Sequence, residues 1–116
     1  MLKPVTAMMV LVLAVPLLIA VCGGRGPQEH SFVIQIQNGK PVEGVKTFGV
    51  KQGDTVTFNI SSDAEGEVHL HGYDLMVDMT PGKTVTLSLT ANATGRFPME
   101  IEDTEVEIGF LEVQPR

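Results

Sequence analysis

Short segments that alternate apolar and polar residues occupy most of the chain between residues 32 and 113. They are rich in β-branched and aromatic side chains, and turn residues such as Asn38-Gly39 and Pro81-Gly82 separate them. A period of two indicates strands with one face in a core, and this spacing predicts an all-β sandwich. We expect about seven or eight strands. They are residues 32–36, 45–50, 55–60, 68–71, 75–79, 85–89, 96–102 and 109–113.

One change of phase predicts a break in the regular structure. The apolar residues of segment 68–70 occupy even positions, whereas those of segment 75–79 occupy odd positions. A single strand cannot bury both sets, because a shift of one residue exchanges its two faces. We therefore expect a bend or bulge at Gly72, which can adopt backbone conformations that other residues avoid.

The N-terminus predicts export. Lys3 supplies a positive start, residues 5–21 carry no charge, and Cys22 stands directly before a polar, glycine-rich run. Residues 18–22 resemble a bacterial lipobox, in which the cysteine is acylated, although Val21 stands where a small residue is usual. Lipidation, ordinary cleavage and an uncleaved membrane anchor all stay open.

This organisation divides the chain into three expected parts. Residues 1–21 are a signal peptide or membrane anchor, and Cys22 is the candidate lipidation site. Residues 22–31 are expected to form a flexible tether in which His30 is solvated. Residues 32–116 are enough for one domain with one core.

Charge and cysteine content limit the partners. The formal charge of −6 becomes −7 when Lys3 is removed with the signal. An acidic domain is poorly suited to nucleic acid, whose binding depends on Lys and Arg, and better suited to a cation or a cationic partner. With one cysteine in the chain, no internal disulfide is possible.

Two of the three histidines, His69 and His71, lie two residues apart. On a strand this spacing places both imidazoles on one face, with Cα atoms about 6.5–7 Å apart. Such a pair can hold copper as Cu(II) or Cu(I), or as second choice Zn(II). The alternative is structural, with His69 at the surface and His71 hydrogen-bonded at the turn. Further donors would be Glu102, Asp103, Asp74 or the thioether of Met76.

Several motifs together resemble the cupredoxin superfamily. They are VHLHGYD (68–74), PGKTVTLSL (81–89), TGRFPMEI (94–101) and GFLEV (109–113). The resemblance covers most of residues 32–113 and implies a cupredoxin-like Greek-key β-sandwich. In these proteins a His-Gly-Phe or His-Ser-Phe segment supplies the first copper histidine. His71-Gly72-Tyr73 matches that segment, so the resemblance makes His71 the candidate first ligand.

The second half of a blue-copper site is missing. In cupredoxins the loop between the last two strands supplies Cys, His and Met, but here Ile101 or a neighbour stands where the cysteine would be. The resemblance therefore implies no type-1 or dinuclear copper centre. Met79 and Met99 keep the phase of their apolar neighbours and are expected in the core. The acidic run 100–107 is interpreted as a solvated face, as edge protection or as a weak cation site.

The sequence thus predicts an exported, membrane-tethered protein of the cell envelope that binds copper or a similar metal ion through His71 and His69. Its expected role is metal handling rather than blue-copper electron transfer. The alternative is a metal-free structural module that binds an envelope protein. We expect no enzyme, since the serines lack a Gly-x-Ser-x-Gly context and neither a phosphate loop nor a zinc-protease motif occurs.

Overall fold

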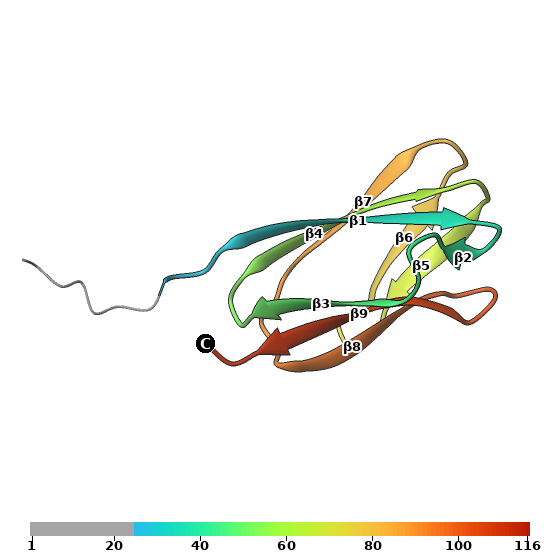
Figure 1. The fold of residues 1–116 in the computed structure, drawn as a ribbon. Helices are drawn as coiled ribbons and strands as arrows, with labels where there is room; N and C mark the ends of the chain where they lie inside the picture. Colours follow the sequence, from blue (N-terminus) through green and yellow to red (C-terminus); the bar gives the residue numbers. More distant parts are fainter. Residues whose placement is uncertain (1–24) are drawn as a thin grey trace, which may run out of the picture.

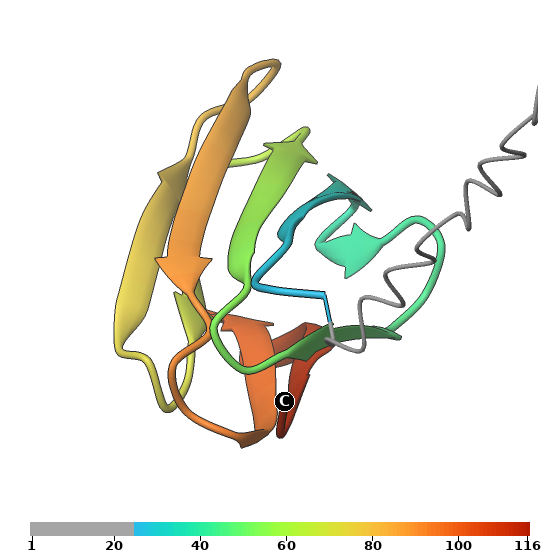
Figure 2. The same cartoon turned by 90° about the vertical axis from the view of Figure 1, so that its left-hand side faces the viewer.

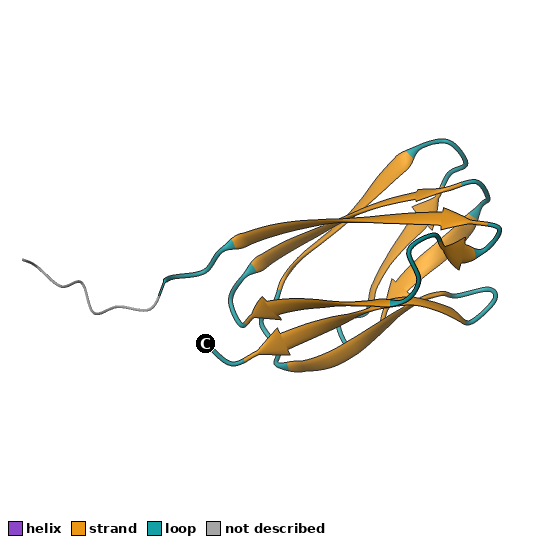
Figure 3. Cartoon of the chain, viewed as in Figure 1, coloured by secondary structure: helices purple, strands orange, loops and turns teal. Residues whose placement is uncertain are grey.

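The computed structural model describes residues 25–116, which contain nine β-strands and no helix (Figures 1 and 3). None of these residues therefore forms an apolar helix long enough to cross a bilayer. The predicted signal or anchor and Cys22 lie outside the described residues. The strands are β1 (Glu29–Gln37), β2 (Lys40–Pro41), β3 (Lys46–Lys51), β4 (Thr55–Ser62), β5 (Gly66–Leu70), β6 (Leu75–Met79), β7 (Thr84–Thr90), β8 (Gly95–Ile101) and β9 (Val106–Gln114).

The strands form two sheets that pack face to face (Figures 1 and 2). One sheet has the order β2-β1-β4-β7 and the other has the order β3-β9-β8-β5-β6. The pairs β1–β4 and β3–β9 are parallel, and the other pairs are antiparallel. The chain crosses repeatedly from one sheet to the other, so local hairpins alone do not make the fold. The predicted all-β sandwich is confirmed.

Strand boundaries differ from the expected ones where polar residues pair with a neighbouring strand. β1 begins at Glu29, inside the segment 22–31 that was expected to be a tether, because residues 29–31 pair with the start of β4. The short β2 was not expected, and β9 begins at Val106 because it forms a hairpin with β8. Pairing with a neighbour overrides the low strand propensity of these polar residues.

The core lies between the two sheets, where alternate residues of each strand meet. Phe58 of β4 is 0% exposed, and its ring packs against Phe32 and Phe48 with centroids 5.7 and 5.3 Å away. Met79 and Met99 are also buried, which confirms their predicted core role. The other large, fully buried side chains are Ile36, Ile60, Leu70, Ile108, Leu111, Val56 and Val68.

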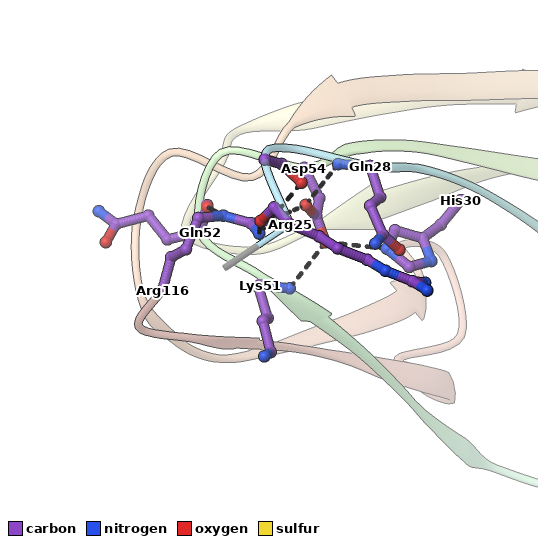
Figure 4. Close-up of polar contacts among 8 residues, drawn as sticks. Arg25, Gln28, His30, Lys51, Gln52, Asp54 and Arg116 are labelled. Atoms are coloured by element: carbon purple, nitrogen blue, oxygen red, sulfur yellow. Dashed lines mark hydrogen bonds and ion pairs between the residues drawn. The ribbon is translucent and has the colours of Figure 1, made fainter. Parts of the chain in front are cut away.

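One carboxylate is buried where β4 begins. The side chain of Asp54 is 3% exposed, and its oxygens accept hydrogen bonds from four groups (Figure 4). The donors are the backbone N–H groups of Gln28 (2.9 Å) and Lys51 (3.0 Å), Nε2 of His30 (2.8 Å) and the guanidinium of Arg116. These groups, with the Gln28 amide first, hold the pKa of Asp54 well below its ordinary value although burial opposes the charge.

The prediction that His30 is a solvated linker residue is wrong. His30 lies in β1, its ring is stacked on Phe32, and its side chain is 27% exposed. Its partner Asp54 is 24 residues away in the sequence, so no local pattern points to the contact.

Replacing Asp54 with asparagine is expected to lower the Tm by on the order of 5–10 °C at neutral pH, because buried donors lose a charged acceptor. The folded-state pKa of Asp54 is lowered. Its charge therefore stabilises the fold above the unfolded-state pKa of about 3.9, and this contribution is lost as the pH falls further.

Thermal melts followed by circular dichroism between pH 7 and pH 2 test this. The Tm of the wild type should fall more steeply below about pH 5 than that of Asp54→Asn. Asp78→Asn, at an exposed position whose carboxylate makes no hydrogen bond within residues 25–116, serves as the control and should resemble the wild type. If the Tm of the wild type and the Tm of Asp54→Asn fell equally with pH below about pH 5, the prediction would be contradicted.

Candidate metal site

His69 and His71 lie on the outer face of the five-stranded sheet. Val68 and Leu70 are fully buried, so the intervening His69 and the following His71 face away from the core. The ring centroids of the two histidines are 4.1 Å apart, with an angle of 41° between the ring planes. The two imidazoles therefore project together, as predicted from their spacing. Their role as metal ligands stays a prediction.

Two carboxylates from β8 meet these rings. β5 and β8 are antiparallel neighbours, with His69 opposite Glu100. Nε2 of His71 lies 2.6 Å from Oε1 of Glu100, and Nδ1 of His69 lies 3.1 Å from Oε2 of Glu102. One nitrogen of each imidazole ring is thus hydrogen-bonded to a carboxylate. Within residues 25–116 the second nitrogens, Nε2 of His69 and Nδ1 of His71, make no hydrogen bond.

Three of these side chains could share one metal ion. His69, His71 and Glu102 each offer one ligand atom, and these atoms all lie within 4.8 Å of one another. Donors bound to one Zn(II) at about 2.0–2.2 Å are at most about 4.4 Å apart, so a small side-chain rotation would close the site. Two imidazoles and a carboxylate suit Cu(II) and Zn(II). Glu100 is then placed to orient the His71 ring, as carboxylates do for metal-bound imidazoles.

The turn after β5 determines where His71 lies. Gly72 has a φ of +85°, and a Cβ at this position would come within 2.4 Å of Cδ1 of Phe97. The Phe97 ring also packs edge-on against Tyr73, with centroids 4.8 Å apart. The Tyr73 hydroxyl donates a hydrogen bond to the carbonyl oxygen of Ala93 at 2.8 Å. Close packing of Gly72 on Phe97 thus holds the backbone next to His71.

The phase change at Gly72 has a different form from the one expected. The sequence predicts a bend or bulge, but the chain reverses completely and β6 runs back along β5. Val68 pairs with Val77, and Leu70 pairs with Leu75. A hairpin brings even and odd positions opposite each other, so both apolar sets can face the core.

A blue-copper centre does not fit the residues present. The one cysteine, Cys22, precedes residues 25–116. Ile101, at the position that the resemblance assigns to the cysteine, is 5% exposed and belongs to the core. The β8–β9 loop (102–105) is hydrogen-bonded beside Glu67 at the start of β5, whereas His71 follows its end. The backbone of this loop therefore lies at the other end of β5 from His71, and within the donor group only the side chain of Glu102, its first residue, reaches back to the histidines.

Glu100 is the member of the site that sequence reasoning missed, because it was assigned to a solvated acidic face. Its side chain is 20% exposed and is hydrogen-bonded to His71. The available signal was that Glu100 and Glu102 have the same two-residue spacing as the histidines. That spacing becomes informative once β8 is known to lie beside β5.

Of the other donors that the sequence suggested, Asp74 and Met76 lie beside His69, whereas Asp103 does not. Oδ1 of Asp74 lies 3.9 Å from Nε2 of His69, but the Asp74 side chain is 93% exposed. Met76 lies opposite His69 in the β5–β6 pair. Asp103 instead lines a surface hollow with Glu65 and is not part of the donor group.

The charges of the domain are polarised along its length. Residues 62–67, 78–83 and 102–107 lie at the end opposite the C-terminus (Figure 1) and carry eight of the fourteen carboxylates. The opposite end carries Arg25, Lys51 and Arg116 around the buried Asp54. The acidic end creates a negative potential that attracts cations, and Glu102 lies at its border.

No protein-family model matches the sequence, and no curated protein is significantly similar to it. Solved structures with a similar fold do exist. A copper-binding protein in its apo form, determined by NMR in solution, has a TM-score of 0.59 and 12% identity, with 78% of this chain and 100% of that chain covered. The blue copper oxidase from Nitrosomonas europaea has a TM-score of 0.58 and 20% identity, with 76% and 39% covered.

A heme-copper terminal oxidase dimer has a TM-score of 0.56 and 18% identity, with 70% of this chain and 60% of that chain covered. The chain thus spans between two fifths and three fifths of the length of the two oxidase chains. At these identities the similarity establishes the fold. Residues 25–116 form a cupredoxin-like β-sandwich, as the sequence resemblance implied.

Proposed function

We propose that this chain is an exported, membrane-tethered cupredoxin-like protein that binds copper or a similar metal ion through His69 and His71. Glu102 is the third donor in this proposal, and Glu100 orients His71. The observation that carries it is the convergence of three ligand atoms within 4.8 Å on one face of the sheet. The proposed role is metal handling, and no reaction is assigned.

The exposure of the site supports acquisition or transfer of the ion rather than electron transfer. The side chains of His71 and Glu102 are 38% and 46% exposed, so solvent or a partner protein could complete the coordination shell. Electron transfer favours a closed shell that changes little between oxidation states. An open shell with carboxylate donors suits exchange of the ion instead.

Export and tethering follow from the signal-like residues 1–21 and from Cys22. The polarised charge supports a defined orientation at the membrane. Arg116 donates hydrogen bonds to the carbonyl oxygens of Arg25 and Gly26, so the chain joins the domain at its basic end. A tether at this end would place the acidic end, and Glu102 with it, away from the membrane surface. In this proposal the protein belongs to the cell envelope.

The decisive experiment is metal binding by the full-length chain, purified in detergent without a histidine tag and stripped with a chelator. Isothermal titration with Cu(II) and with Zn(II) should show one ion per chain, bound much more tightly than about 1 mM. Elemental analysis of the protein before stripping identifies the metal acquired in the cell. Absence of binding tighter than about 1 mM for both ions would overturn the proposal.

The alternative, a metal-free module that binds an envelope protein, is favoured by a different observation. A groove of about 240 Å³ lies between β1 and β3, and it is lined by Val33, Phe48 and Ile108 among others. Val33 is 66% exposed, so its apolar side chain at this groove is accessible to a partner.

Cross-linking in intact cells distinguishes the two functions. The alternative expects a specific protein adduct that Val33→Glu abolishes and that chelation of metal leaves unchanged. The metal-handling function expects any adduct to depend on His69 and His71 and to be indifferent to Val33→Glu.

A further inference from the structure

Met76 is an exposed apolar side chain that does not pack against the hydrophobic core. It is 57% exposed, and the other large exposed apolar residues within 25–116 are Val33, Val42 and Val45. Those three belong to the segments around the groove between β1 and β3. Met76 stands apart from them, on the outer face of β6.

The register of the β5–β6 hairpin places Met76 beside the metal site. Met76 is opposite His69, between two pairs of apolar residues that face the core. Residues directly opposite each other in such a pair have Cβ atoms about 4.5–5.5 Å apart on one face of the sheet. A methionine side chain is unbranched and flexible enough to bring its sulfur to a neighbouring imidazole over that distance.

β5 therefore has different donors on its two sides. On the β8 side, Glu100 offers a carboxylate oxygen to the His71 ring and Glu102 offers one to the His69 ring. On the β6 side, Met76 offers a thioether. Imidazole with carboxylate suits Cu(II), whereas soft thioether sulfur selects Cu(I). The two histidines are common to both donor sets.

We propose that Met76 is a ligand for Cu(I), bound through its sulfur together with His69 and His71. Cu(II) is held by the same histidines with Glu102. This inference rests on the proposed function, because both ions need the two imidazoles. The protein binds copper in the oxidation state in which the ion arrives, and the proposal includes no electron transfer by the protein.

The two donor sets would let one site accept copper in either oxidation state by moving side chains alone. Since Met76 is exposed, its sulfur can also be replaced from the solvent side by a donor of a second protein. This property fits an acceptor or carrier of copper better than a permanent store.

The test measures both affinities on the full-length chain in detergent. Cu(I) affinity is measured without oxygen, with ascorbate, by competition with a chromophoric Cu(I) chelator, and Cu(II) affinity is measured by titration without reductant. Met76→Leu should lower the Cu(I) affinity by at least about tenfold, which is the lower range for losing even an outer partner of a metal ligand. Its Cu(II) affinity should be unchanged. Glu102→Gln should show the reverse pattern.

Met79→Leu is the matched control, because Met79 lies on the same strand but faces the core at 5% exposure. It should leave both affinities unchanged. X-ray absorption of the Cu(I) form should show a sulfur ligand in the wild type that disappears in Met76→Leu.

The possible failures of this inference and of the proposed function are distinguishable. Equal Cu(I) affinity of the wild type and Met76→Leu overturns the role of Met76. Binding of Cu(II) without binding of Cu(I) overturns it as well, but supports the proposed function. Binding of neither copper ion overturns the role of Met76, and it overturns the proposed function as well if Zn(II) is not bound either.

Discussion

Replacing His69 and His71 together with alanine is expected to lower the Cu(II) affinity of the full-length chain by at least about 100-fold, or about 2.7 kcal/mol. Both proposed nitrogen donors are lost, and Glu102 would remain as the single donor of the group. Loss of an outer partner of a metal ligand already costs about 10–100-fold, so loss of two ligands should cost no less. Isothermal titration of the wild type and the double variant measures the difference.

The same variant should fold normally, because both rings lie on the outer face of the sheet and outside the core. The side chains of His69 and His71 are 16% and 38% exposed and each is hydrogen-bonded to a glutamate, so we expect a loss of about 1 kcal/mol for each position without loss of the fold. Added Cu(II) should raise the Tm of the wild type, since a ligand that binds the folded state stabilises it, and should not raise the Tm of the variant.

His30→Ala is the control for this experiment. His30 is hydrogen-bonded to Asp54 at the other end of the domain, so its loss should lower the Tm and leave the Cu(II) affinity unchanged. Wild-type affinity in the His69→Ala plus His71→Ala variant would show that the ion binds elsewhere.

Gly72→Ala is expected to destabilise the domain by about 2–5 kcal/mol. The φ of +85° at Gly72 costs a residue with a Cβ about 1–2 kcal/mol. In addition, the new Cβ would come within 2.4 Å of the Phe97 ring, and such overpacking typically costs about 1–3 kcal/mol. The Phe97 ring has little room to move, because it also packs edge-on against Tyr73, with ring centroids 4.8 Å apart.

Urea denaturation followed by circular dichroism measures this change in the free energy of unfolding. Gly82→Ala is a matched control, because Gly82 has a φ of +73° but no heavy atom within 4 Å of a Cβ built there. It should lose about 1–2 kcal/mol from the backbone conformation alone. Equal losses in the two variants would show that the contact with Phe97 has no energetic importance.

The two variants should also differ at the metal site. Displacement of the Gly72 backbone moves the adjacent His71, so Gly72→Ala should weaken Cu(II) binding. Gly82 lies in the turn between β6 and β7, and Gly82→Ala should not affect Cu(II) binding.

Much of the fold could be predicted from the sequence because alternation is a local property. It identified eight of the nine strands within a few residues, the interior positions of Met79 and Met99, and the common face of His69 and His71. It also located the break at Gly72, because two apolar segments of opposite phase cannot belong to one strand. These results need only neighbouring residues and the two-residue period of a strand.

The surroundings of those residues depended on which strands became neighbours. Glu100 is 29 residues from His71, and Asp54 is 24 residues from His30, so neither contact has a local signature. β5 lies between β8 and β6, and this order alone brings carboxylates to one side of the histidines and Met76 to the other. A strand's alternation determines which side chains share a face, but strand order and register determine which side chains meet there.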